Sequence, residues 1–218
     1  MTPRLYVTGT DTDVGKTTVT GALAGAIVAR HGRATVVKIV QTGISPAGLG
    51  DADIAAAAAA CEALELARFA KAADPWTAAL AAGAPPLRAE PLAQRIADIA
   101  GPIVAEGLGG AAVPLNESET ITDVARRAGL DSLVVVGVRL GCINHAILTL
   151  EFLRRSGIRT RGVVLSVRWP DTANSYVEEV EHVIRNFSPV LGVMRFQQIA
   201  PATEVGLDIL RGMEAACP

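Results

Sequence analysis

The sequence is poor in cysteine, in aromatic residues and in net charge. Its 218 residues include three cysteines, 4% aromatic residues and a formal net charge of −2. The cysteines, Cys61, Cys142 and Cys217, are odd in number and lack C-x-x-C spacing, so neither a disulfide framework nor a zinc site is indicated. The near-neutral charge argues against a nucleic acid or a membrane surface bound mainly through charge.

Long apolar runs are missing as well. No uninterrupted apolar stretch approaches the roughly 18–20 residues of a membrane-spanning helix. Near the N-terminus, apolar Leu5-Tyr6-Val7 gives way at once to Thr8-Gly9-Thr10-Asp11, unlike the apolar core of a signal peptide. We therefore expect a cytoplasmic protein with neither a membrane nor a nucleic acid as partner.

Short apolar runs alternate with amphipathic segments along most of the chain. The runs predict strands over 5–8, 34–40, 102–105, 132–138, 162–167 and 189–194. Helical patterns cover 17–31, 54–69, 121–128, 143–156 and 173–187, whereas proline-rich 70–101 has no clear assignment. Continuously apolar strands separated by helices predict one α/β domain over 1–218. We expect it to be doubly wound, with a mostly parallel sheet and helices on both faces.

A glycine-rich turn follows the first predicted strand, in the stretch YVTGTDTDVGKTT from Tyr6 to Thr18. It departs from the strict pattern G-x-x-x-x-G-K-[ST] because Gly9 stands one position early. A strand, a glycine-rich turn and a helix start are nevertheless the context of a phosphate-binding loop, in which backbone N–H groups face the phosphates. Lys16 would reach the β- and γ-phosphates and Thr17 would ligate Mg²⁺, which predicts a P-loop NTPase-like fold. The alternative is an ordinary helix start.

Charged residues also lie at the ends of two other predicted strands and before a predicted helix. Lys38 lies near the carboxyl end of a buried strand, the edge at which open α/β sheets bind ligands. A structural ion pair is the alternative for this lysine. Glu106 ends a further strand and offers a carboxylate for Mg²⁺. Asp51 and Asp53 precede an alanine-rich helix, where either one could be a cap, and we expect Asp51 to have that role.

Four stretches together resemble the dethiobiotin synthetases, ATP-dependent ligases of biotin synthesis. They are GTDTDVGKT from Gly9, KIVQTG from Lys38, EGLGG from Glu106 and VGVRLGCINH from Val136. The resemblance covers roughly residues 4–192. Partitioning-type P-loop ATPases have a related loop but usually carry a second lysine near its start, which this sequence lacks.

The resemblance implies a Mg-ATP-dependent cyclo-ligase that converts 7,8-diaminononanoate and CO₂ into dethiobiotin through a carbamate and a carbamic–phosphoric anhydride. It also implies a homodimer with active sites near the interface. Lys16 and Lys38 would be catalytic. The implied Mg²⁺ ligands are Thr17, Asp53 and Glu106. The implied nucleotide contacts are Asp13, Val14, Gly15, Lys16, Thr17, Thr18, Glu106, Gly107, Leu108, Gly109, Ser166 and Val167. The implied substrate contacts are Thr12, Lys38, Thr42, Gly141, Cys142, Ile143 and Asn144.

The resemblance weakens where the family reads the adenine. An asparagine often follows the family's next strand, but this chain has Ser166-Val167 there. A proline-containing segment that cradles the base is replaced by Met194-Arg195-Phe196. The nucleotide preference therefore stays open. A partitioning-type ATPase switch, or a nucleotide-binding homologue without ligase activity, remains the alternative function.

Overall fold

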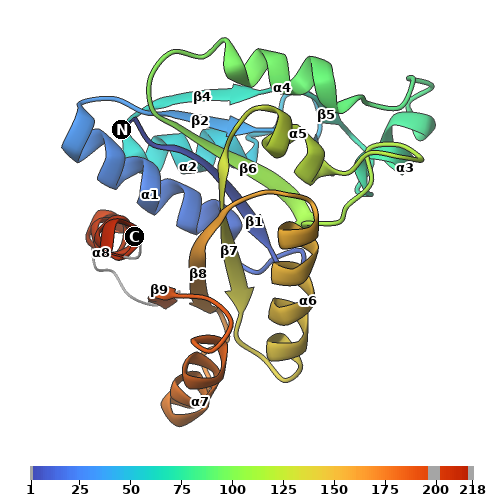
Figure 1. Cartoon of the computed structure of the whole chain (residues 1–218). Helices are drawn as coiled ribbons and strands as arrows, with labels where there is room; N and C mark the ends of the chain where they lie inside the picture. Colours follow the sequence, from blue (N-terminus) through green and yellow to red (C-terminus); the bar gives the residue numbers. More distant parts are fainter. Residues whose placement is uncertain (1, 196–201, 216–218) are drawn as a thin grey trace.

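A computed structural model describes residues 2–195 and 202–215. Its main sheet has seven strands in the order β4-β2-β6-β1-β7-β8-β9, and every pair is parallel (Figure 1). These strands are β1 (Arg4–Gly9), β2 (Thr35–Lys38), β4 (Glu62–Glu65), β6 (Ile103–Gly110), β7 (Asp131–Gly137), β8 (Thr160–Val167) and β9 (Val190–Arg195). Two short strands, β3 (Gln41–Thr42) and β5 (Arg68–Phe69), form a separate parallel pair.

Helices cover both faces of the main sheet, as Figure 1 shows. One face carries α1 (Lys16–His31), α2 (Asp51–Ala59) and α8 (Ala202–Ala215). The other carries α4 (Ala89–Ala97), α5 (Ile121–Arg127), α6 (Cys142–Arg155) and α7 (Asn174–Ile184). A short helix, α3 (Pro75–Ala81), lies beside β5. A buried apolar cluster fills the interface between the sheet and the helices on each face, so the predicted doubly wound α/β fold is confirmed.

All six predicted strands are present, but the helix predicted over 54–69 is wrong in its second half. Helix α2 ends at Ala59, because Ala60 adopts a left-handed conformation with φ 50°. The chain then turns into β4, which pairs with β2 at the edge of the sheet. Glu62-Ala-Leu-Glu65 has helical propensity, so pairing along β2 overrides the local preference. Helices α3, α4 and α8 had no counterpart in the predicted elements.

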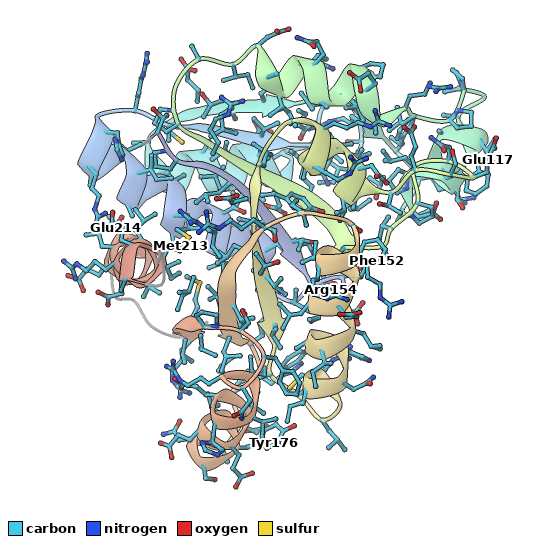
Figure 2. The ribbon with its side chains drawn as sticks, in the orientation of Figure 1. Glu117, Phe152, Arg154, Tyr176, Met213 and Glu214 are labelled. Atoms are coloured by element: carbon cyan, nitrogen blue, oxygen red, sulfur yellow. The ribbon has the colours of Figure 1, made fainter. Side chains whose placement is uncertain are left out.

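Helix α1 is packed tightly on two sides by other helices. A Cβ atom on Gly21 would lie 3.2 Å from the Ala55 carbonyl oxygen of α2, and one on Gly206 of α8 would lie 2.0 Å from the Ala22 carbonyl oxygen. Met213 and Glu214 of α8 lie near α1 in Figure 2, and Glu214 forms an ion pair of 2.6 Å with Arg30. The helix that begins at the glycine-rich turn is therefore held from both sides. In the described part of the chain, no helix is long and apolar enough to span a membrane.

Candidate active site

The turn between β1 and α1 has the backbone geometry of a phosphate-binding loop. Asp13 and Gly15 adopt positive φ values of 57° and 98°. Gly15 is the N-cap of α1, and no side chain caps the helix there. A Cβ atom on Gly15 would lie 2.6 Å from Ser166 Oγ, so only glycine fits both the conformation and the space. The first N–H groups of α1, free of a side-chain cap, are suited to an anion.

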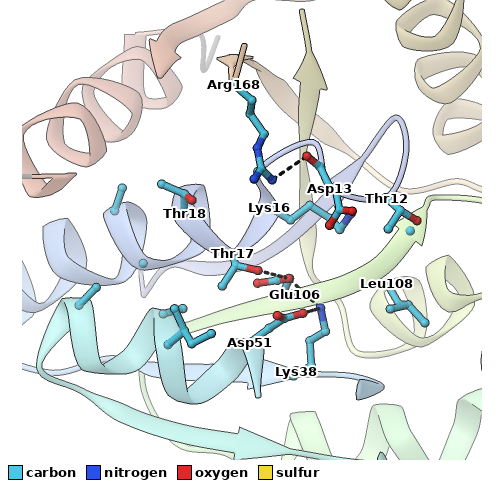
Figure 3. Close-up of a pocket in the computed structure, with 17 residues that line it drawn as sticks. Thr12, Asp13, Lys16, Thr17, Thr18, Lys38, Asp51, Glu106, Leu108 and Arg168 are labelled. Atoms are coloured by element: carbon cyan, nitrogen blue, oxygen red, sulfur yellow. Dashed lines mark hydrogen bonds and ion pairs between the residues drawn. The ribbon is translucent and has the colours of Figure 1, made fainter. Parts of the chain in front are cut away.

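A cavity of about 420 Å³ opens in front of this turn, at the carboxyl ends of the strands (Figure 3). It brings together half of the predicted site residues, from the β1–α1 turn with the start of α1, from β2 and from β6. Its lining includes Thr12, Asp13, Gly15, Lys16, Thr17, Thr18, Lys38, Glu106, Leu108 and Gly109. Such a crevice outside the carboxyl ends of the strands is where doubly wound sheets bind their ligands.

Three charged side chains form a compact cluster beneath the turn. The register of β2 and β6 places Lys38 opposite Glu106. Lys38 Nζ lies 2.7 Å from Glu106 Oε1, 2.6 Å from Asp51 Oδ2 and 2.9 Å from the Gly107 carbonyl oxygen. The Lys38 and Glu106 side chains are each only 1% exposed. Burial alone would lower the pKa of Lys38, but the Glu106 and Asp51 carboxylates outweigh it and raise that pKa above its ordinary value.

No carboxylate of the described residues forms an ion pair with Lys16, unlike Lys38. Its Nζ donates to the Asp11 carbonyl oxygen at 2.8 Å, and the residue is 7% exposed. Burial, together with the nearby charge of Lys38, lowers the pKa of Lys16 to about 8. A phosphate group bound beside Lys16 would stabilise its buried ammonium and so offset the cost of keeping that charge out of water.

Glu106 keeps one oxygen without a partner. Oε1 accepts hydrogen bonds from Thr17 Oγ1 at 3.0 Å and from Lys38, whereas buried Oε2 has no hydrogen-bond partner within residues 2–195 and 202–215. Figure 3 shows Thr17, Glu106, Asp51 and Lys38 converging on one end of the cavity. A hydroxyl and two carboxylates, one of which has an unpaired oxygen, form a donor set that fits Mg²⁺ bound together with a triphosphate.

The two aspartates at the start of α2 exchange the places expected from the sequence. Asp53, expected to face the metal, instead accepts the Gly50 N–H at 2.9 Å and caps the helix. Asp51, expected to be the cap, lines the cavity and pairs with Lys38. Two positions along a helix correspond to a rotation of about 200°, so only one of the two carboxylates can face the cavity.

Several other predicted contacts lie outside the cavity lining. Val14 is buried behind the turn against Gly9, and Ser166, at the end of β8, lies behind Gly15. Val167 is buried beside Ser166. Thr42, half-buried in β3, pairs with Phe69.

The predicted substrate contacts at the start of α6 form a separate group. Gly141 and Asn144 are exposed, Ile143 is half-buried and Cys142 is buried. Among the described residues of this chain, these four are absent from the cavity lining. An ion pair of 2.5 Å between Arg139 and Asp11 connects the preceding loop to the glycine-rich turn.

Arg168 lines the cavity but was missing from the predicted site. It follows β8 directly, and its Nη1 donates to the Asp13 carbonyl oxygen at 2.7 Å (Figure 3). Its place just beyond the carboxyl end of a strand was the signal in the sequence that could have identified it. Of the segment 194–196, expected near the base, Phe196 lies outside the described residues.

Sequence comparisons identify the family. A family model described as an AAA domain matches residues 3–200. The ATP-dependent dethiobiotin synthetase BioD of Saccharopolyspora erythraea is 40% identical over 170 residues, covering 76% of this chain and 74% of the relative. That of Pseudomonas aeruginosa (strain UCBPP-PA14) is 38% identical over 216 residues, covering 92% and 93%. The chain belongs to the dethiobiotin synthetase family.

More distant P-loop proteins share the fold of this dethiobiotin synthetase family member. The septum site-determining protein MinD of Pyrococcus horikoshii, solved with Mg-ADP, superposes with a TM-score of 0.62. It is 14% identical, and the match covers 96% of this chain and 94% of MinD. At that identity the likeness shows a shared P-loop architecture alone.

Proposed function

We propose that the chain is an ATP-dependent dethiobiotin synthetase, a cytoplasmic ligase that carboxylates 7,8-diaminononanoate with CO₂ and closes the product to a cyclic urea. The observation that carries the proposal is the buried Lys38 ammonium, held between Glu106 and Asp51 in the cavity lining, where Thr17 of the phosphate-binding turn reaches the same Glu106 oxygen. Family membership supplies the substrate class, and the cavity supplies a place where a triphosphate and a small acceptor meet.

The triphosphate end is formed by the turn and the first residues of α1. The N–H groups around Gly15, Lys16, Thr17 and Thr18 would bind phosphate oxygens at the positive end of the helix dipole. Lys16 would place its charge on the β- and γ-phosphates. Ser166, Val167 and Arg168 lie on the side of the turn where the nucleoside would leave the cavity, and they would influence the base preference.

Mg²⁺ would be held by Thr17, Glu106 and Asp51, whose side chains converge where the γ-phosphate would end. Bound there with the triphosphate, the ion would neutralise charge on the β- and γ-oxygens. The unpaired Glu106 Oε2 supports this assignment, because a buried carboxylate oxygen without a donor is costly in the absence of a cation.

Lys38 would stabilise the negative charge that develops as the reaction proceeds. One neutral amine adds to CO₂ and loses a proton to give a carbamate, whose oxygen attacks the γ-phosphorus as ADP leaves. The second amine then attacks the carbonyl carbon of the mixed anhydride, and phosphate leaves. These steps need positioning and charge stabilisation more than a strong protein base. Thr12, Asp13 and Thr42 would orient the diamine.

The substrate carboxylate would bind at the start of α6 of a second subunit, at Gly141, Cys142, Ile143 and Asn144. The separation of these residues from the cavity of their own chain supports a homodimer with shared active sites. Leu140, 93% exposed, and Leu148, 61% exposed, flank this segment and offer apolar area for the contact.

The test is to incubate the purified protein with diaminononanoate, bicarbonate, Mg²⁺ and each of ATP, CTP and GTP, and to detect dethiobiotin by mass spectrometry. Product that requires both the diamine and a triphosphate is expected, and the ranking of the triphosphates measures the base preference. Nucleotide hydrolysis that is independent of the diamine, without product, would favour a P-loop ATPase switch. Nucleotide binding with neither product nor hydrolysis would favour a homologue without ligase activity.

A further inference from the structure

The loop over residues 43–50, between β3 and α2, leads directly to Asp51, and an arginine outside the cavity binds two of its carbonyl groups. Arg68 of β5 donates through Nη1 to the Ser45 carbonyl oxygen at 2.9 Å and to the Gly48 carbonyl oxygen at 2.7 Å. Its Nε and Nη2 donate to the two oxygens of Glu65 at 2.7 and 2.8 Å. One guanidinium therefore fixes two carbonyls of the loop to a carboxylate of the sheet.

The Arg68–Glu65 pair also packs against the beginning of α2. A Cβ atom on Gly50 would lie 1.8 Å from Glu65 Oε1 and 2.9 Å from Arg68 Nη2, so the Gly50 backbone rests directly on the pair. Asp53 caps the Gly50 N–H and lies 4.0 Å from Arg68 Nη2. The first turn of α2 is thus located by the Arg68–Glu65 pair.

Asp51, which follows Gly50, is held through both its backbone and its side chain. The Asp51 N–H donates to Gln41 Oε1 at 2.9 Å, and the Asp51 carboxylate reaches Lys38 Nζ. Gln41 pairs with Arg68 in the two-stranded sheet. The backbone on both sides of the Asp51–Lys38 contact is therefore tied to the strand that carries Arg68.

We propose that Arg68 is a positioning residue of the ligase, which orients Asp51 toward Lys38 and the metal by anchoring the 43–50 loop and the start of α2. This inference rests on the proposed function. It depends on the planar fork of the guanidinium, which donates in two directions at once. A lysine at the same position keeps the charge but cannot make both sets of contacts.

The experiment compares Arg68→Met and Arg68→Lys with a matched control, Arg154→Met. Arg154, labelled in Figure 2, forms the same two-bond pair with Glu151, three residues away on α6, at 2.8 and 2.9 Å. It is 72% exposed and lies at the opposite end of α6 from Gly141. Three quantities are measured: hydrogen exchange of residues 43–51, the Mg²⁺ concentration for half-maximal dethiobiotin formation, and ADP affinity in EDTA.

In Arg68→Met, we expect faster exchange over 43–51 and a loss in Mg²⁺ affinity or turnover of about 10–100-fold, the range found when groups that orient metal ligands are removed. ADP affinity in EDTA should stay within about twofold of wild type, because the phosphate-binding turn makes no contact with Arg68. Arg68→Lys should fall between wild type and Arg68→Met, and Arg154→Met should match wild type.

Unchanged exchange in Arg68→Met, or faster exchange with unchanged Mg²⁺ dependence and turnover, would overturn the positioning role. Full activity in Arg68→Lys would overturn the need for the fork. Should Arg68→Met fail to fold, Gly50→Ala is the second variant. The φ of −88° at Gly50 permits alanine, but the new Cβ would displace Glu65. Gly50→Ala should therefore show the faster exchange and the loss in Mg²⁺ affinity or turnover expected of Arg68→Met. If the wild type makes no dethiobiotin, the proposed function fails, while exchange and the Mg²⁺ dependence of ATP binding still test the role of Arg68.

Discussion

Removing Lys38 should destabilise the protein, and removing Glu106 as well should restore part of the loss. Lys38→Met leaves the 1% exposed Glu106 carboxylate without its ammonium. Breaking a buried pair from one side costs about 3–5 kcal/mol. At about 2–4 °C per kcal/mol for a chain of this length, the melting temperature should fall by about 6–20 °C.

Glu106→Gln should cost less, about 1–3 kcal/mol, because Lys38 keeps Asp51 at 2.6 Å. The double variant removes both buried charges, and the remaining Asp51 is 29% exposed and can be hydrated. We therefore expect Lys38→Met/Glu106→Gln to be more stable than Lys38→Met alone by about 2 kcal/mol.

The assay is urea unfolding of the four proteins at pH 7.5 with EDTA and without nucleotide, followed by circular dichroism. Comparable slopes would show that the variants unfold from similarly compact states. A double variant less stable than Lys38→Met, or a Lys38→Met cost below about 1 kcal/mol, would refute the idea that an uncompensated buried charge dominates this cluster.

Three further predictions concern the phosphate and metal ends of the cavity. Since the pKa of Lys16 is lowered to about 8 and a bound phosphate raises it, nucleotide affinity should fall as pH rises through 8 and binding should take up protons, measurable by calorimetry in buffers of different ionisation enthalpy. Asp51→Asn should raise the Mg²⁺ midpoint by about tenfold, roughly 1.4 kcal/mol. Asp53→Asn should instead cost about 0.5–2 kcal/mol of stability as a weakened cap, with little change in the Mg²⁺ midpoint; equal effects of the two changes on that midpoint would contradict the assignment. Gly15→Ala should weaken ADP binding and lower the free energy of unfolding by about 1–3 kcal/mol, because residue 15 has a positive φ. Adding Ser166→Ala removes the nearby hydroxyl but should not restore stability or binding. Thermal unfolding with and without ADP measures both effects.

The sequence predicts best what depends on local backbone rules or on shared strand ends. The glycine-rich turn is identifiable because Gly9, Gly15 and Lys16 act within one strand–turn–helix unit. The meeting of Lys38 with Glu106 follows because parallel strands end at the same edge of a sheet.

The sequence predicts poorly what depends on residues far apart in the chain. The choice between Asp51 and Asp53 involves Glu65 at the end of β4 and Arg68 of β5, which lie against Gly50. The helical propensity of 62–65 conceals β4 in the sequence. Arg168 reaches Asp13 across the site from the end of β8. Neither contact leaves a periodic signal in the sequence.

The close fit of Gly206 against the Ala22 backbone also bears on how the chain is assembled. Helix α1 and β1 are synthesised early, but the apolar side of α1 that α8 covers stays open until the whole sheet has been made. Domains with such late closure pass through states with exposed apolar surface, which aggregate readily. A nascent chain halted before α8 would therefore expose that apolar side of α1, where chaperones could bind it.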